Sequence, residues 1–71
     1  DVKWRGTADM IPRIKEGLAR LPDGYRAVLS MILFEGFDYE EVAKILEVKE
    51  STVRSQYMRG RDKLIKIVNE L

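Results

Sequence analysis

The feature that most constrains the fold is a pair of helical patterns separated by only a few residues. The first pattern follows Asp38, and its apolar side chains recur at helical spacing: Val42, Ala43, Ile45 and Leu46. The second extends over about residues 50–69. Two helices joined by so short a connection cannot easily lie antiparallel, so we expect them to cross at a steep angle. Residues 38–64 therefore predict a helix-turn-helix.

The connection between the two patterns contains a residue that fits a tight turn poorly. Such a turn usually needs one residue with positive φ, which glycine adopts at the lowest cost. Glu47 stands where this glycine is expected. If Glu47 adopts the left-handed region there, the cost is on the order of 1 kcal/mol. Asp38 is the expected N-cap of the first helix, and Glu41 can complete a capping box with it.

Two further helices are predicted ahead of this pair. The first begins at residue 8 or 10, with Thr7 or Asp9 as cap, and ends near residue 20. Its apolar stripe comprises Met10, Ile11, Ile14, Leu18 and Leu21. Residues 1–6 have no periodicity and predict a linker from an upstream domain, which leaves residues 7–71 as one all-α domain.

The second of these helices is expected from about Pro22 to residue 35, where Gly36 can end it in a left-handed conformation. It is the most apolar stretch of the chain. Its main buried face is predicted to comprise Tyr25, Val28, Leu29, Ile32 and Leu33, widened by Ala27, Met31 and Phe34. So wide an apolar surface predicts burial on more than one side.

Composition argues against an enzyme. The 71 residues include no cysteine and no histidine, which removes thiolate ligands and the commonest general base near neutral pH. The carboxylates of residues 35–47 fit ordinary partners of a helix dipole better than a catalytic pair. We therefore predict no catalytic residue, no metal site and no cofactor.

No apolar run approaches the roughly 18 residues of a membrane span. The longest, residues 27–34, is interrupted by Ser30 and is expected to be a buried helix. We therefore predict no membrane association. The absence of cysteine permits a cytoplasmic location, which is the location we predict.

Positive charge is concentrated in the last helix. Residues 1–48 carry seven Lys and Arg against nine Asp and Glu, whereas residues 49–71 carry six against three. Basic residues gathered on one element are typical of a surface that binds nucleic acid. A solvated helix face would show a similar run of charge.

Steps of about 100° per residue separate two faces of this last helix. The inner face comprises Val53, Tyr57, Gly60, Leu64 and Ile67 or Leu71. The outer face comprises Ser51, Ser55 and Met58, flanked by Arg54 and Arg61 on one side and by Thr52 and Arg59 on the other. No acid lies between Ser51 and Arg61, which an ordinary solvated face explains less easily than a DNA-binding face does.

The residue types of the outer face suit the DNA major groove. Arginine can pair bidentately with guanine O6 and N7 or bind phosphate, and Ser, Thr and Gln bond to base edges or phosphate. Met58 could contact a thymine methyl group.

The sequence also resembles region 4 of bacterial sigma factors of the extracytoplasmic-function (ECF) type. The similarity extends from residue 8 to residue 71. It is carried by Leu21 and Pro22, Tyr25 and Arg26, Glu35 and Gly36, Glu41 to Ala43, Thr52 to Ser55, and the pair Arg59 and Arg61. The resemblance implies a compact, winged-helix-like four-helix domain with a C-terminal helix-turn-helix. Such a domain recognises the double-stranded promoter −35 element and docks on the flap of the RNA polymerase β subunit. An anti-sigma factor would be a further partner.

The resemblance also implies roles for individual residues. Arg54, Ser55, Met58 and Arg59 occupy base- and backbone-reading positions, Arg61 and Arg26 phosphate positions, and Thr52 a backbone position. Three residues depart from the pattern: Ser51 and Glu47 stand where glycine is frequent, and Gly60 where alanine is frequent. The predicted DNA-binding residues are Arg26, Ser51, Thr52, Arg54, Ser55, Gln56, Met58, Arg59 and Arg61.

Two other functions fit the same pattern. One is a response-regulator-type (LuxR-like) effector domain, which would dimerise through Ile65, Ile67, Val68 and Leu71 of the last helix. The other is a protein-interaction module that binds only an anti-sigma factor or the polymerase flap through the apolar helix and the corner at residues 34–39. For the sigma-factor hypothesis we expect the isolated domain to be a monomer.

Overall fold

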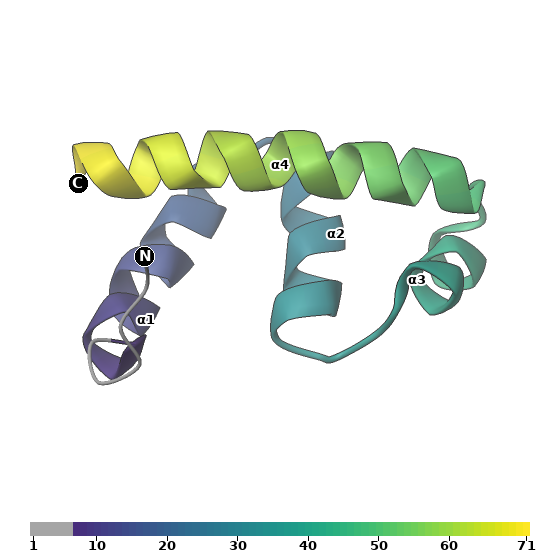
Figure 1. Cartoon of the computed structure of the whole chain (residues 1–71), viewed down its shortest axis with the longest axis horizontal. Helices are drawn as coiled ribbons and strands as arrows, with labels where there is room; N and C mark the ends of the chain where they lie inside the picture. Colours follow the sequence, from purple (N-terminus) through teal and green to yellow (C-terminus); the bar gives the residue numbers. More distant parts are fainter. Residues whose placement is uncertain (1–6) are drawn as a thin grey trace.

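Four α-helices form the domain, and a computed structural model describes them over residues 7–71, with residues 7–10 described by their backbone alone. The helices are α1 (Thr7–Ala19), α2 (Asp23–Leu33), α3 (Tyr39–Leu46) and α4 (Glu50–Glu70). α4 lies across one side of the other three and contacts each of them (Figure 1). Residues 7–71 contain no strand, so the all-α prediction is confirmed.

Several predictions concern residues outside this description. They are the linker at residues 1–6, the caps at Thr7 and Asp9, and the Met10 side chain of the apolar stripe. No helix within residues 7–71 combines the length and apolar character that crossing a membrane requires.

The core consists of two clusters that meet at α2. One contains Leu18, Leu21, Leu29, Leu64 and Val68, and the other contains Val28, Val42, Ala43 and Val53. The consecutive residues Val28 and Leu29 are both fully buried, yet they belong to different clusters. α2 is therefore buried on more than one side, as its wide apolar surface predicts. α4 contributes to both clusters, which fixes its inner face along most of its length.

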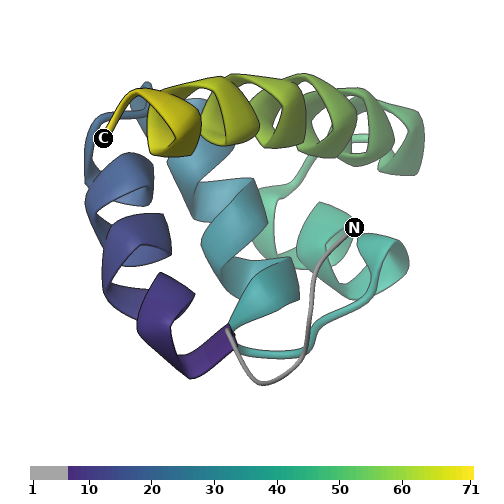
Figure 2. The ribbon, with the colours of Figure 1, turned by 60° about the vertical axis from the view of Figure 1, so that its left-hand side comes forward.

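Burial of Val68 was not predicted, and several predictions about apolar faces are wrong. In the predicted buried face of α2, Leu33 is 46% exposed, and Ala27 and Phe34 are also exposed. Ile45 of α3 is 50% exposed, and Ile11 of the α1 stripe is exposed as well. Figure 2 shows α2 running away from α4, so the last turn of α2 lies at the edge of the molecule. Apolar periodicity identifies the side of a helix, whereas burial also requires another element to cover that turn.

The start of the helix-turn-helix has the predicted capping box. Asp38 Oδ1 accepts a hydrogen bond from the Glu41 amide at 2.8 Å, and Glu41 Oε1 accepts one from the Asp38 amide at 3.0 Å. These bonds satisfy two amide groups at the helix terminus. They fix the residue at which α3 begins.

The turn between α3 and α4 has the predicted left-handed residue. Glu47 has φ 58° and ψ 46°, the only positive φ of a non-glycine residue within residues 7–71. The conformation lets the Val48 amide donate to the Ala43 carbonyl at 3.0 Å. Gly36 has φ 77°, also as predicted. It follows α2, which ends at Leu33 rather than at residue 35.

Two buried glycines bring α4 close to its neighbours. A Cβ added to Gly17 of α1 would lie 2.7 Å from Leu64 Cδ1. A Cβ added to Gly60 of α4 would lie 3.1 Å from both Tyr25 Cβ and Leu29 Cδ1. Gly60 therefore allows α2 and α4 to approach closely, which gives a packing reason for a small residue in the middle of a long helix.

Candidate nucleic-acid interface

The first half of α4 presents a continuous outward face. Val53 is fully buried against α2 and α3 and fixes the rotation of the helix. Besides Glu50, the exposed residues of this half are Ser51, Thr52, Arg54, Ser55, Met58 and Arg59. Met58 is 52% exposed although it is apolar. The structure thus brings these predicted residues together on one side of one helix.

Arg54 is held on two sides. Its Nη2 donates to Glu50 Oε1 at 3.0 Å, one turn earlier on α4. Its Cζ lies 5.3 Å from the centroid of the Tyr39 ring at the start of α3. A guanidinium over an aromatic face is attracted by the electron density of the ring. Arg54 is consequently more restrained than an exposed arginine usually is.

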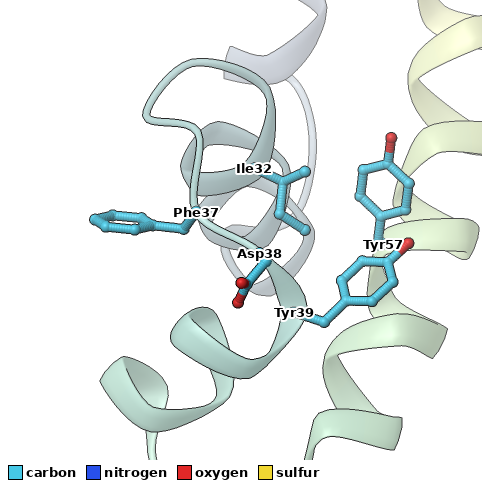
Figure 3. A pocket seen from close by; sticks show the side chains of 5 residues that line it. All are labelled: Ile32, Phe37, Asp38, Tyr39 and Tyr57. Carbon is cyan, nitrogen blue, oxygen red and sulfur yellow. The ribbon is translucent and has the colours of Figure 1, made fainter.

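Tyr39 is itself supported by a second aromatic ring. The centroids of Tyr39 and Tyr57 lie 5.8 Å apart at an interplanar angle of 58°, a tilted arrangement favourable for aromatic pairs. Figure 3 shows the two rings next to each other between α3 and α4, while the ring of Phe37 points away from them. The pair borders an open pocket of about 230 Å³, also lined by Ile32, Phe37 and Asp38.

Two predicted residues do not lie free on this face. Arg26 donates to the Ala19 carbonyl at 3.1 Å and pairs with Asp23, so its guanidinium joins the end of α1 to the start of α2. Gln56 is half-buried, and its Nε2 lies near Gly24 of α2. Contact with DNA would require Arg26 to give up two internal partners.

The outward face ends near residue 61. Arg61 is exposed and lies 3.7 Å from the carboxylate of Asp62, whose side chain is 74% exposed. Asp62 follows directly after the acid-free stretch and lies on the outer side of the helical wheel. A negative charge there limits a phosphate-binding surface to residues 51–61.

Sequence reasoning missed two residues that bear on this face, Glu50 and Tyr39. The spacing of Glu50 and Arg54, four residues apart on a helix, is a recognised ion-pair signal and could have identified Glu50. No local pattern could have identified Tyr39, because its contact with Arg54 depends on how α3 and α4 cross. In the part of the chain that the structure describes, no three acidic side chains gather closely enough to hold a metal ion.

Comparison with known proteins gives one consistent result. The family model described as "Sigma-70, region 4" matches residues 12–64. The RNA polymerase sigma-H factor of Pseudomonas aeruginosa is 31% identical over 58 residues, 82% of this chain. The ECF RNA polymerase sigma factor SigE of Mycolicibacterium smegmatis is 41% identical over 51 residues, 72% of this chain. The match spans 30% of the first relative and 20% of the second.

Proposed function

The chain belongs to the sigma-70 region 4 family, and we propose from this that it binds double-stranded promoter DNA at the −35 element. It would do so as part of a sigma factor that directs RNA polymerase to promoters in the bacterial cytoplasm. The observation that carries the proposal is the outward face of α4, where exposed Arg54 and Arg59 flank Ser55 and Met58 on a helix anchored by buried Val53. The family consists of transcription factors rather than enzymes.

The chemistry of this face supports a contact with the major groove. An arginine fork matches guanine O6 and N7, and small hydroxyl side chains bond to either base edges or phosphate. The number of basic residues on the face is small, so few phosphate contacts form and the affinity that they supply is low. We expect the chain alone to bind DNA with micromolar or weaker affinity at physiological salt and to lose affinity steeply as salt rises.

A protein surface accompanies the DNA face in this proposal. Large apolar side chains are exposed near the ends of α2 and α3: Leu33, Phe34, Ile45 and Val48. Exposed apolar residues of this kind are suited to bury against another protein. We propose that they serve contacts with the flap of the RNA polymerase β subunit or with an anti-sigma factor.

The response-regulator-type alternative is less well supported. Dimerisation through the last helix would need its apolar residues on the outside. Ile65 and Leu71 are exposed, but Val68 is 7% exposed and belongs to the internal core, and Ile67 is half-buried against it. We therefore propose a monomer for the isolated domain. Sedimentation equilibrium of the chain at micromolar concentration tests this directly, and a dimer would favour the alternative.

The test of the DNA-binding proposal uses three arginine variants. A duplex is first selected by the chain from a randomised pool, and a scrambled duplex of equal composition serves as reference. Arg54→Ala and Arg59→Ala are each expected to weaken binding to the selected duplex by about 1–3 kcal/mol. Arg20→Ala is the matched control, because Arg20 forms the same type of exposed ion pair, with Glu16 at 2.7 Å on α1. Unchanged affinity in both α4 variants would refute the proposal.

A further inference from the structure

The two arginines on the outward face differ in how firmly they are held. Arg54 is held by the Glu50 carboxylate at 3.0 Å and by the Tyr39 ring at 5.3 Å. For Arg59, no ion pair and no aromatic contact is found within residues 11–71. One face therefore carries a restrained guanidinium and an unrestrained one.

This difference matters because the two possible DNA targets make different demands. A base edge offers two acceptors in one plane, so the fork must approach in a fixed orientation. A phosphate accepts hydrogen bonds from many directions and attracts any nearby positive charge. A restrained arginine loses less conformational freedom on binding and is suited to the base edge.

The position of Glu50 adds a second effect. Its carboxylate lies beside Arg54 in the first turn of α4, close to the DNA-facing surface. There it offsets the charge of Arg54 and repels phosphate, which weakens binding most on sequences where Arg54 finds no matching base edge. A device that reduces binding to the wrong sequences more than to the right one increases discrimination.

We propose that Glu50 and Tyr39 are positioning residues that make Arg54 the base-reading arginine of α4, while Arg59 binds the phosphate backbone. This inference rests on the proposed function, since it assumes that α4 contacts DNA. Tyr57 belongs to the same arrangement, because its ring supports the ring of Tyr39. The contacts link α3 to the reading face of α4, so the first helix of the helix-turn-helix contributes to specificity through its packing.

A purely structural role for the Glu50 and Arg54 pair is the competing explanation. Exposed ion pairs four residues apart add little to stability. The chain contains a natural comparison in Glu16 and Arg20 of α1, which have the same spacing and a shorter distance of 2.7 Å. Within residues 11–71, no aromatic ring lies under Arg20. Glu16→Gln therefore measures the effect of losing such a pair alone.

The experiment measures affinity for the selected duplex, for its single-base-pair variants and for the scrambled duplex. Tyr39→Leu removes the ring face and is expected to reduce discrimination about 3- to 10-fold, the effect of ordering one long side chain on binding. Its affinity for the scrambled duplex should stay unchanged. Glu50→Gln should bind the scrambled duplex more tightly and also discriminate less. Tyr39→Phe keeps the ring and should behave as the unaltered chain, as should Glu16→Gln.

A readout specific to positioning comes from combining these changes with Arg54→Ala. If Tyr39 and Glu50 act through Arg54, neither change lowers discrimination further once Arg54 is absent. Thermal melts show whether the Tyr39→Leu protein is folded. If it is not, the inference is tested by Glu50→Gln alone, because this change is at an exposed side chain. Arg59→Ala should weaken binding to both duplexes equally and reduce the salt slope by about one.

Several outcomes would overturn the inference. One is a loss in Tyr39→Leu that is equal for the selected and scrambled duplexes, and another is a Glu50→Gln protein that behaves like Glu16→Gln. A third is an undiminished effect in the Arg54→Ala background. If Arg54→Ala has no effect and Arg59→Ala weakens binding, this inference fails and the proposed function stands. If neither variant changes binding, the proposed function fails as well.

Discussion

Replacing Glu47 by glycine should make the domain more stable, although it removes a side chain from the turn. Glu47 holds φ 58° and ψ 46°, a conformation that costs an L-residue with a Cβ about 1–2 kcal/mol and costs glycine almost nothing. Glycine also has more conformational freedom in the unfolded chain, which reduces this stabilisation by about 0.5–1 kcal/mol. The net expectation is an increase of about 0.5–1 kcal/mol in the free energy of unfolding.

The comparison that isolates this effect is between Glu47→Gly and Glu47→Ala. Both remove the same carboxylate, and both keep the backbone bond from the Val48 amide to the Ala43 carbonyl. They differ only in whether a Cβ remains at a left-handed residue, so the glycine variant should be more stable by about 1 kcal/mol. Urea and thermal denaturation measure the difference, and about 1 kcal/mol corresponds to roughly 4–8 °C in Tm for a domain of this size.

Lys44→Gly provides the opposite control. Lys44 is exposed in α3 with ordinary helical geometry, where glycine costs about 1 kcal/mol relative to good helix formers. Replacement by glycine should therefore raise the free energy of unfolding at residue 47 and lower it at residue 44. A Glu47→Gly protein no more stable than Glu47→Ala would refute the assignment of strain to this turn.

Two further changes test the packing and capping that hold α4 in place. Asp38→Ala should lower the free energy of unfolding by about 0.5–2 kcal/mol through loss of the helix cap, which urea denaturation measures. The control is Glu40→Ala, which removes a first-turn carboxylate that makes no cap bond. Gly17→Ala should lower Tm, because the new methyl would lie 2.7 Å from Leu64 Cδ1 and 3.1 Å from Val68 Cγ2. Both side chains are buried in the core and have little room to move. The cost of overpacking, about 1–3 kcal/mol, then exceeds the gain in helix propensity of about 1 kcal/mol. Gly24→Ala, whose nearest neighbour would be 3.9 Å away, should leave Tm unchanged or raise it. Equal melting temperatures for the two glycine variants would contradict this account of the contact between α1 and α4.

The features that sequence reasoning predicted correctly are those set by neighbouring residues. The capping box depends on Asp38 and Glu41, three residues apart, and the left-handed turn depends on the shortness of the connection around Glu47. The buried stripe of α4, with Val53 and Leu64, follows from helical periodicity alone. Such signals need no knowledge of the remaining chain.

The features that escaped prediction depend on which elements meet. Leu33 and Ile45 have the right type and spacing for burial, yet no described element covers them. Arg26 has a local partner in Asp23, but its bond to the Ala19 carbonyl requires the ends of α1 and α2 to come together. The contact of Tyr39 with Arg54 likewise arises only from the crossing of α3 and α4.

The continuity of α4 has a mechanical consequence. Its 21 residues form one rod of about 30 Å, and the two core clusters grip it near opposite ends. Gly60, where such a rod would bend most readily, lies against α2 at the crossing point and has little room to yield. Because α4 is held near both ends, it moves with the rest of the domain as one rigid body. A tilt of about 5° about the DNA-facing end would displace the other end by about 3 Å over this length. A partner seated at the far end could therefore sense how the first half of α4 sits on its target.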